Sequence, residues 1–210
     1  MTTAAQSLLN TGGPFDIVLA DPPWKFKSNS QEKPGRNAMG HYDCMELDEI
    51  MALPVSEIAA RDALLLLWVT VPFLPHGLET AKAWGFTYKS ELMWNKDRPG
   101  TGFWARNRHE VVLICRRGKF PCRSKGENAP FPDSVIEGQQ RQHSRKPDAL
   151  HDMSEAVPQW ADRDARLEMF ARETRPGWIA WGNQTTHFDP VDLDDLLDTS
   201  PDQEVVDLLS

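Results

Sequence analysis

The sequence lacks the features that mark secreted, membrane-bound or cysteine-rich metal proteins. Its longest apolar run, Ala63 to Val69, is far shorter than the ~18 residues that cross a bilayer. Its N-terminus has neither the basic start nor the apolar stretch of a signal peptide. The 3 cysteines are an odd number with no Cys-x-x-Cys spacing, which argues against a disulfide framework or a cysteine-rich zinc site. We therefore expect a cytoplasmic protein with no membrane contact and no bound metal.

Basic residues are absent from the end of the chain. Asp189 to Ser210 contains eight acidic residues and no Lys or Arg, so this segment alone accounts for the net charge of −8. The rest of the chain is balanced, yet Lys96 to Lys146 carries 12 of the 23 basic residues and only 5 acidic ones. Such a basic stretch binds phosphates with little sequence preference. The alternative is an ordinary solvated surface.

The apolar pattern predicts an α/β domain with a mostly parallel sheet. Phe15–Ala20 and Ala63–Val69 are typical of buried strands. Further strands are predicted at 86–94, 110–115 and 178–182, and helices at 47–58 (two short ones split by Pro54), 74–84, 147–157 and 160–174. The polar segments 25–41 and 116–145 are predicted to be loops, and loops of such length are often functional.

Asp21-Pro22-Pro23-Trp24 follows the first predicted strand directly. In doubly wound sheets, ligands bind beyond the carboxyl ends of the strands. Asp21 is a hydrogen-bond acceptor, the two prolines fix where the backbone carbonyls point, and Trp24 offers a face on which a base can stack, worth about 1–3 kcal/mol. Together they could hold a planar ring that bears an exocyclic amine. The alternative is a proline-rich turn beside a core tryptophan.

Around this motif the chain resembles the DPPW family of N6-adenine methyltransferases, which includes the eukaryotic mRNA adenosine methyltransferase and its bacterial and phage relatives. The resemblance spans roughly 15–184. The motifs follow in family order: ADPPW at 20–24, LPV at 53–55, LLLWV at 65–69, WGF at 84–86, WNK at 94–96, GFW at 102–104, Glu110, SRKP at 144–147, EMFAR at 168–172 and GW-x-x-WGNQ at 177–184. The catalytic motif precedes the presumed cofactor strand, as in the permuted beta class. The resemblance thus implies a Rossmann-like, S-adenosylmethionine-dependent methyltransferase fold with a single mostly parallel sheet flanked by helices.

The resemblance also implies roles for the catalytic motif. Asp21 is expected to face both the target amine and the amino group of S-adenosylmethionine. The carbonyl of Pro22 is expected to accept the second N6–H, while Pro23 and Trp24 pack against the adenine. The amine lone pair is delocalised into the ring, so two acceptors would localise it for attack, and positioning would supply most of the rate.

Other residues are assigned to the cofactor or the target by the same resemblance. Lys146 is expected near the cofactor carboxylate or the target; Arg172, Asn183 and Gln184 match positions that bind the ribose and amino-acid portions of the cofactor. Trp104 and Glu110 match positions close to the target. Four of them have a plainer alternative: a solvated lysine before a helix for Lys146, a turn after a strand for the two amides, and a core residue for Trp104.

The nucleic acid is expected to be DNA first and RNA second, since the compact chain, without a eukaryotic-style N-terminal extension, suggests a bacterial or phage enzyme. The rivals are a non-catalytic nucleic-acid-binding paralogue that supports a partner methyltransferase, and a methyltransferase for a small amine or protein side chain. Whether the chain forms a homodimer or a heterodimer stays open.

We expect a methyltransferase domain at 1–188 and an acidic tail at 189–210. The tail is either an amphipathic segment that docks or a frayed end.

Overall fold

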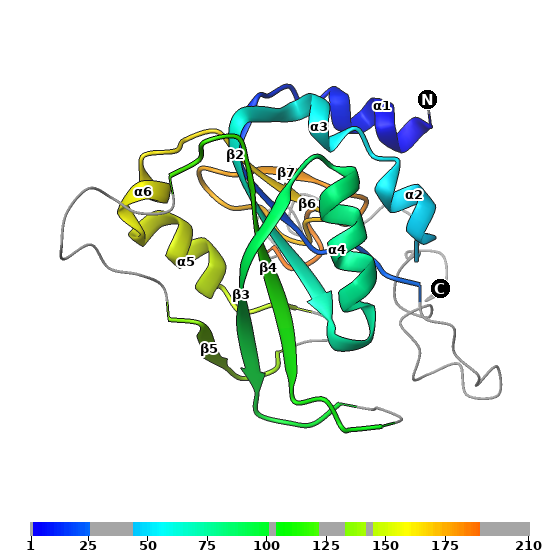
Figure 1. Cartoon of the computed structure of the whole chain (residues 1–210), viewed down its shortest axis with the longest axis vertical. Helices are drawn as coiled ribbons and strands as arrows, with labels where there is room; N and C mark the ends of the chain where they lie inside the picture. Colours follow the sequence, from blue (N-terminus) through cyan, green and yellow to red (C-terminus); the bar gives the residue numbers. More distant parts are fainter. Residues whose placement is uncertain (1, 26–43, 101–103, 122–132, 142–144, 190–210) are drawn as a thin grey trace, which may run out of the picture.

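A seven-stranded sheet forms the centre of the described chain (Figure 1). The computed structural model describes residues 2–25, 44–100, 104–121, 133–141 and 145–189. The strand order is β5-β3-β4-β2-β1-β6-β7, and neighbouring strands are parallel except where β4 pairs with β2 and β3. The strands are β1 (Phe15–Ala20), β2 (Ala59–Thr70), β3 (Thr87–Lys96), β4 (His109–Arg117), β5 (Val135–Gly138), β6 (Arg166–Met169) and β7 (Ile179–Trp181).

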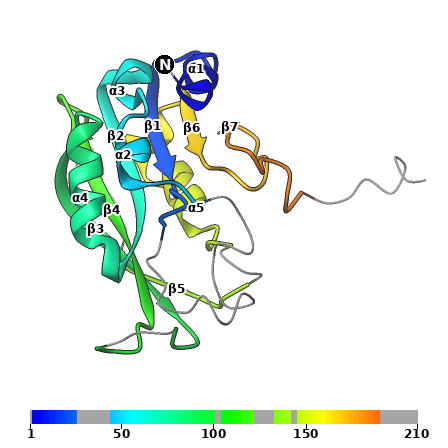
Figure 2. The same cartoon turned by 90° about the vertical axis from the view of Figure 1, so that its right-hand side faces the viewer.

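Helices cover both faces of this sheet, and α4 and α5 lie on opposite sides of it (Figure 2). The helical elements are α1 (Thr3–Leu9), α2 (Leu47–Met51), α3 (Val55–Ile58), the short 3₁₀ turn η3 (Val71–Phe73), α4 (Leu74–Ala83), α5 (Ala149–Ala156) and α6 (Pro158–Ala161). None of the helices in these described ranges is long and apolar enough to cross a membrane.

Burial on both faces explains why β1 and β2 are nearly continuous apolar runs. Successive side chains of a strand point to opposite faces. Val18 and Ala20 pack into the core layer that contains α4, whereas Ile17 and Leu19 pack into the layer that contains α5. A strand buried on both sides needs no polar alternation, which is why such runs are typical of parallel sheets.

The strand order changes direction at β1, which pairs with β2 on one side and with β6 on the other. A crevice beyond the carboxyl ends of the strands is expected at such a point. Because β4 runs antiparallel, its beginning lies at this same edge: Glu110 pairs with Thr70 of β2 and with Trp94 of β3. The fold therefore brings the residue after β1 and the start of β4 to one side of the molecule.

The predicted α/β class and single mostly parallel sheet are confirmed, but two local predictions are wrong. The helix predicted at 160–174 is instead α6 followed by strand β6. Arg, Leu, Glu and Met favour helices, but pairing of 166–169 with both β1 and β7 overrides this preference. The loop predicted at 116–145 contains strand β5, which pairs with the end of β3. The loop predicted at 25–41 lies almost wholly outside the described residues, and so does the tail after Asp189.

Close packing of α4 on the sheet gives a test of the fold. A Cβ atom added at buried Gly77 would lie 2.5 Å from Val69 Cγ2 and 3.2 Å from Leu113 Cδ1. Val69 is β-branched and lies in the central part of the sheet, so it has little freedom to move away. Gly77→Ala should therefore lower the free energy of unfolding by about 1–3 kcal/mol, although alanine is the better helix former. Urea denaturation measures this change.

Lys82→Ala, at an exposed position of the same helix, is the matched control and should stay within about 0.5 kcal/mol of wild type. A Gly77→Ala protein as stable as wild type would show that α4 does not pack as described.

Candidate active site

A tight turn directly after β1 places Asp21 at the crevice. The backbone N–H of Trp24 donates to the carbonyl of Pro22 at 2.8 Å, and the N–H of Asp21 faces the Met169 carbonyl of β6 at 3.4 Å. Pro22 is buried and Asp21 is half-buried. The Pro22 carbonyl retains a second lone pair, because a carbonyl oxygen accepts two hydrogen bonds. The turn thus presents a carboxylate and a backbone acceptor side by side.

Four side chains of alternating charge link the carboxyl ends of β1 and β3 and the beginning of β4 to the segment before α5. Lys146 Nζ lies 2.8 Å from Asp21 Oδ2 and 3.3 Å from Glu110 Oε2, and Glu110 Oε1 accepts from Lys96 Nζ at 2.8 Å. The exposed fractions of these side chains range from 10% for Lys96 to 27% for Asp21. The structure therefore brings Asp21, Lys146 and Glu110 together, and Lys146 is not a solvated surface residue. Lys96 was missed by sequence reasoning, although the motif that contains it, WNK, was noticed.

The two carboxyl groups of this cluster have opposite pKa shifts. Burial raises the pKa of Asp21, and the single neighbouring cation, Lys146, offsets this only in part. Burial acts in the same direction on Glu110, but the two cations Lys146 and Lys96 outweigh it and lower the pKa of that carboxyl. Glu110 is thus fixed in its charged form, whereas Asp21 binds a proton more readily. Neighbouring acids with divergent pKa values are common at catalytic sites.

The lysines of this cluster lie over two tryptophan rings. Lys146 Nζ is 5.5 Å from the centroid of Trp68, and Lys96 Nζ is 5.5 Å from that of Trp94. The two indoles contact each other edge to face, with centroids 6.0 Å apart. The two lysine–tryptophan contacts have the geometry of cation–π interactions. The indole rings therefore attract the two ammonium groups and help to orient them.

Trp24 lies in the core, in the layer that contains α4. It is 5% exposed, its indole N–H donates to the Trp68 carbonyl at 3.3 Å, and its ring stacks on Phe73 at 5.9 Å. This placement agrees with the alternative of a core tryptophan beside a proline-rich turn. Its contact with an adenine stays a prediction.

A pocket that is open to solvent lies beside Asp21. Its wall includes Lys146, Glu168, Phe170 and Arg172. Phe170 has φ +61°, an uncommon conformation for a residue other than glycine. Strained residues of this kind often occur at functional sites. Here the left-handed turn leads the chain from the end of β6 along the pocket.

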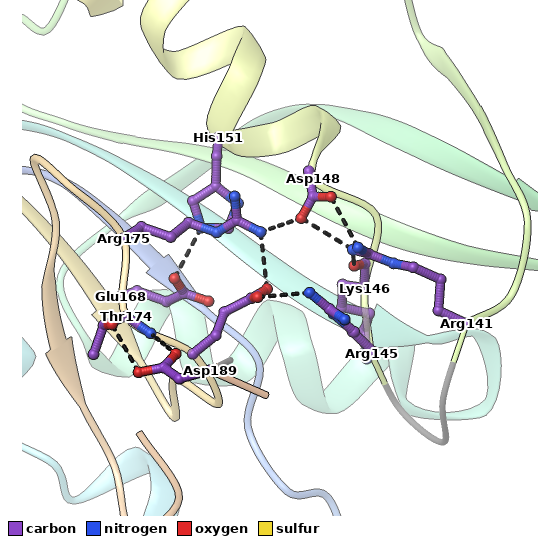
Figure 3. Close-up of polar contacts among 10 residues, drawn as sticks. Arg141, Arg145, Lys146, Asp148, His151, Glu168, Thr174, Arg175 and Asp189 are labelled. Atoms are coloured by element: carbon purple, nitrogen blue, oxygen red, sulfur yellow. Dashed lines mark hydrogen bonds and ion pairs between the residues drawn. The ribbon is translucent and has the colours of Figure 1, made fainter. Parts of the chain in front are cut away.

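A network of arginines and carboxylates joins the segment that carries Lys146 to the segment after β6 (Figure 3). Asp148 pairs with Arg141 at 2.9 Å and also with Arg175. Glu173 in turn pairs with Arg175 and Arg145, both at 2.8 Å. The two segments are therefore held together by charge, a feature that no motif in the sequence pointed to.

A buried histidine supports the pocket from α5. His151 Nε2 lies 2.8 Å from Glu168 Oε2, and its ring packs edge to face on Trp178 at 5.1 Å. Both His151 and Glu168 line the pocket. Sequence reasoning missed this pair, because the two residues are brought together only by packing of α5 against β6.

Of the predicted cofactor residues after β6, the structure places Arg172 at the pocket but not Asn183 or Gln184. Arg172 lines the pocket, with its guanidinium 4.4 Å from the ring centroid of Phe188. Asn183 is exposed and Gln184 half-buried in the turn after β7, and neither lies among the described residues that line the pocket. β7 is an edge strand in which Ile179 is 48% exposed, so it is less buried than the sequence suggested. The roles of Asn183 and Gln184 stay predictions.

Trp104 lies on the connection between β3 and β4 and is fully exposed, so the alternative of a core residue is wrong. Its predicted contact with the target is not tested by this geometry.

The pocket can bind a ligand that carries charges of both signs. Asp21, Glu168 and Glu173 supply negative charge, Lys146, Arg145 and Arg172 supply positive charge, and Trp68, Phe170 and Phe188 supply apolar surface. Within the described residues, no three His, Cys, Asp or Glu side chains are grouped to hold a metal ion.

Comparison with known proteins finds one family model and several methyltransferases that are similar to this chain. The MT-A70 family model matches residues 15–184. The Type II methyltransferase M.MunI of Mycoplasma sp is 28% identical over 184 residues, which cover 80% of this chain and 76% of that protein. The N(6)-adenosine-methyltransferase MT-A70-like protein of Arabidopsis thaliana is 32% identical over 82% of this chain and 24% of its own length. The human N(6)-adenine-specific methyltransferase METTL4 is 28% identical over 89% of this chain and 41% of its own length.

The lowered pKa of Glu110 predicts how stability depends on pH. A carboxyl whose pKa is lower in the folded state stabilises the protein above its ordinary pKa, here near 4.5, and this contribution is lost as pH falls through the folded-state value. Glu110→Gln should lower the free energy of unfolding by about 1.5–3 kcal/mol at pH 7, because it breaks hydrogen bonds between charged groups. The difference from wild type should shrink below pH 4.5 in urea denaturation curves.

Glu57→Gln, on the exposed side of α3, is the control and should stay within about 0.5 kcal/mol of wild type. If the gap between Glu110→Gln and wild type were constant with pH, Glu110 would not be the charged partner of the two lysines.

Proposed function

Because the chain belongs to the MT-A70 family, we propose that it transfers the methyl group of S-adenosylmethionine to the N6 amine of adenine in nucleic acid, with DNA as the first substrate and RNA as the second. The observation that carries this proposal is the position of Asp21. It lies beside the Pro22 carbonyl at the carboxyl edge of β1, and it borders both the pocket and the Lys146–Glu110 cluster.

The turn after β1 provides the two acceptors that an adenine amine needs. The ion pair with Lys146 involves Oδ2 of Asp21, so Oδ1 is the oxygen that can accept one N6–H. The second lone pair of the Pro22 carbonyl accepts the other. Holding both N–H bonds draws the nitrogen towards tetrahedral geometry and frees its lone pair for attack. This is catalysis by positioning and by preorganised acceptors.

The raised pKa of Asp21 suits the proton that the reaction releases. As the amine gains a methyl group it becomes strongly acidic, and a carboxylate with an increased proton affinity is a competent acceptor. Glu110, whose pKa is lowered, stays charged and pairs with Lys146 beside the reacting amine. The cluster therefore assigns different tasks to its two acids.

The pocket residues fit S-adenosylmethionine. The cofactor, when bound, supplies an electrophilic methyl group on a cationic sulfonium. Asp21 and Glu168 are acceptors for its positive groups, and Lys146 and Arg172 are donors for its carboxylate and hydroxyls.

DNA is favoured because this chain matches 76% of the length of the Type II methyltransferase M.MunI. By contrast, it matches only 24% of the length of the plant adenosine methyltransferase and 41% of the length of the human protein. The activities and partners of those longer proteins belong to this chain only as proposals. The intact Asp-Pro-Pro-Trp motif argues against the non-catalytic paralogue. Methyl transfer from radiolabelled cofactor to single- and double-stranded DNA and RNA, with nucleoside analysis of the product, tests the proposal.

Loss of the first acceptor should slow methyl transfer strongly. We expect Asp21→Ala to lower kcat by about 10²–10³-fold, the usual effect of removing one group that stabilises the transition state. Asp152→Ala, at an exposed position of α5, is the matched control and should retain wild-type turnover. Wild-type turnover by Asp21→Ala on adenine-containing DNA or RNA would refute the assignment of Asp21.

The cofactor site can be tested separately from turnover. Arg172→Ala, Asn183→Ala and Gln184→Ala should each raise the Kd for S-adenosylmethionine by about 2–10-fold, because each removes a hydrogen-bonding side chain. Thr186→Ala, in the exposed turn after β7, serves as control. Calorimetry that finds unchanged affinity in all three variants would place the cofactor elsewhere.

A further inference from the structure

Past the stretch that the family model matches, the chain turns back to the pocket. The match ends at residue 184, and the residues that follow form a turn that leads to Asp189. Phe188 of this turn lines the pocket, as Arg172 does. The ring of Phe188 is half-buried, although the residue lies in neither a strand nor a helix. Its position therefore depends on contacts that the turn itself makes.

Hydrogen bonds attach this turn to the connection between β6 and β7. The backbone N–H of Phe188 donates to the Arg172 carbonyl at 2.8 Å. Asp189 accepts twice from Thr174, through Oδ1 from the backbone N–H at 2.7 Å and through Oδ2 from the hydroxyl at 2.8 Å (Figure 3). Two successive residues of the turn are thus fixed against the same segment of the pocket wall.

The ring of Phe188 contacts two positively charged groups that also line the pocket. The guanidinium carbon of Arg172 lies 4.4 Å from the ring centroid, and that of Arg145 lies 5.1 Å from it. Arg172 follows β6 and Arg145 precedes α5, so the ring joins two separate segments of the chain. Each cation is attracted by the electrons of the aromatic face. Stacking uses the face of a guanidinium group and not its N–H donors, which lie in the plane of the group.

Phe188 holds Arg172 at both ends, at the backbone carbonyl and at the guanidinium group. An arginine side chain has many rotamers, and a ligand that orders it loses part of its binding free energy to this ordering. Contacts that order the side chain in the free protein reduce that cost, so they increase affinity without touching the ligand. The alternative is that Phe188 only fills space beside the pocket. The two roles differ in whether the effect of the ring depends on Arg172.

We propose that Phe188 is a positioning residue for the cofactor, which holds the guanidinium group of Arg172, and to a lesser extent that of Arg145, in the orientation that binds S-adenosylmethionine. Asp189 and Thr174 fix Phe188 in this position. The inference rests on the proposed function, because it takes S-adenosylmethionine as the ligand of the pocket. It adds to the binding machinery two residues, Phe188 and Asp189, that lie beyond the family match.

Replacing the ring by an aliphatic side chain should weaken cofactor binding. In the 210-residue chain, Phe188→Leu should raise the Kd for S-adenosylmethionine by about 3–5-fold in calorimetry, because leucine is apolar but has no aromatic face for the guanidinium groups. Phe188→Tyr keeps the ring and should bind within about twofold of wild type. Tyr88→Leu, which removes an exposed ring from β3, is the matched control. Wild-type affinity in Phe188→Leu would overturn the proposal.

A double-mutant cycle separates positioning from general support of the fold. If the ring acts through Arg172, Phe188→Leu should raise the Kd by less than about twofold when it is added to Arg172→Ala. A rise of about 3–5-fold in both backgrounds would show that the ring acts independently of Arg172 and would contradict the proposal. Asp189→Asn should raise the Kd by about 2–3-fold, because an amide nitrogen replaces one of the two acceptors that fix the turn.

Kinetics and stability give readouts that a purely structural role would not separate. Phe188→Leu should raise KM for S-adenosylmethionine with kcat unchanged at a saturating cofactor concentration, because the ring orders a binding group and not a reacting one. Urea denaturation checks that each variant is folded. A fall in kcat at saturating cofactor without any rise in KM would show that the ring supports the chemical step instead, and the proposal would be wrong.

The outcomes distinguish this inference from the proposed function. Methyl transfer by wild type with unchanged cofactor affinity in Phe188→Leu would refute the positioning role and leave the function standing. Cofactor binding that depends on Phe188 and Arg172 together, without methyl transfer to DNA or RNA, would refute the function and keep the positioning role. A wild-type protein that binds no S-adenosylmethionine would refute both.

Discussion

The ammonium group of Lys146 is the contact on which the site depends, because it is shared by carboxylates from two strands. Asp21 follows β1 and Glu110 begins β4, and β2 lies between them in the sheet. Without the cation, two half-buried negative charges would face each other at the crevice. Removing one partner of such a buried group typically costs about 3–5 kcal/mol, since it leaves a charge uncompensated. The arginine–carboxylate network around Asp148 and Glu173 holds the segment of Lys146 in place, so local electrostatics determine the geometry of the acceptors.

Much of the fold could be predicted because burial on both faces leaves a clear pattern. Phe15–Ala20 matches β1 residue for residue, and Pro54 separates α2 from α3 as its missing N–H requires. Prediction failed where local preference and tertiary pairing disagree. Arg166–Met169 is a helix-forming sequence that becomes a strand because β1 and β7 lie on either side of it, and β5 exists only by pairing with β3. Neither partner can be identified from a short window of sequence.

The site was predictable where a motif carries it and not where packing creates it. Asp21, Lys146 and Glu110 come from segments far apart in the chain, and the resemblance alone brought them together before the structure did. Lys96 and the pair formed by His151 and Glu168 were not recognised, because a lysine at a strand end or a histidine in a helix has no distinctive neighbourhood in sequence. Trp24 was predicted to pack against an adenine, yet it lies in the core, where its indole N–H donates to the Trp68 carbonyl.

The reversed direction of β4 determines which of its residues lie at the crevice. A parallel neighbour would have to return through a long crossover on one face of the sheet, and the crevice would then receive only the end of that strand. The antiparallel pairing of β3 and β4 instead brings Lys96, the last residue of β3, into an ion pair with Glu110 near the start of β4. The register of the two strands therefore fixes where the Glu110 carboxylate lies beside Lys146. Because a hairpin connection joins the two strands beyond this ion pair, residues can be added to the connection without changing the strand register that positions Glu110.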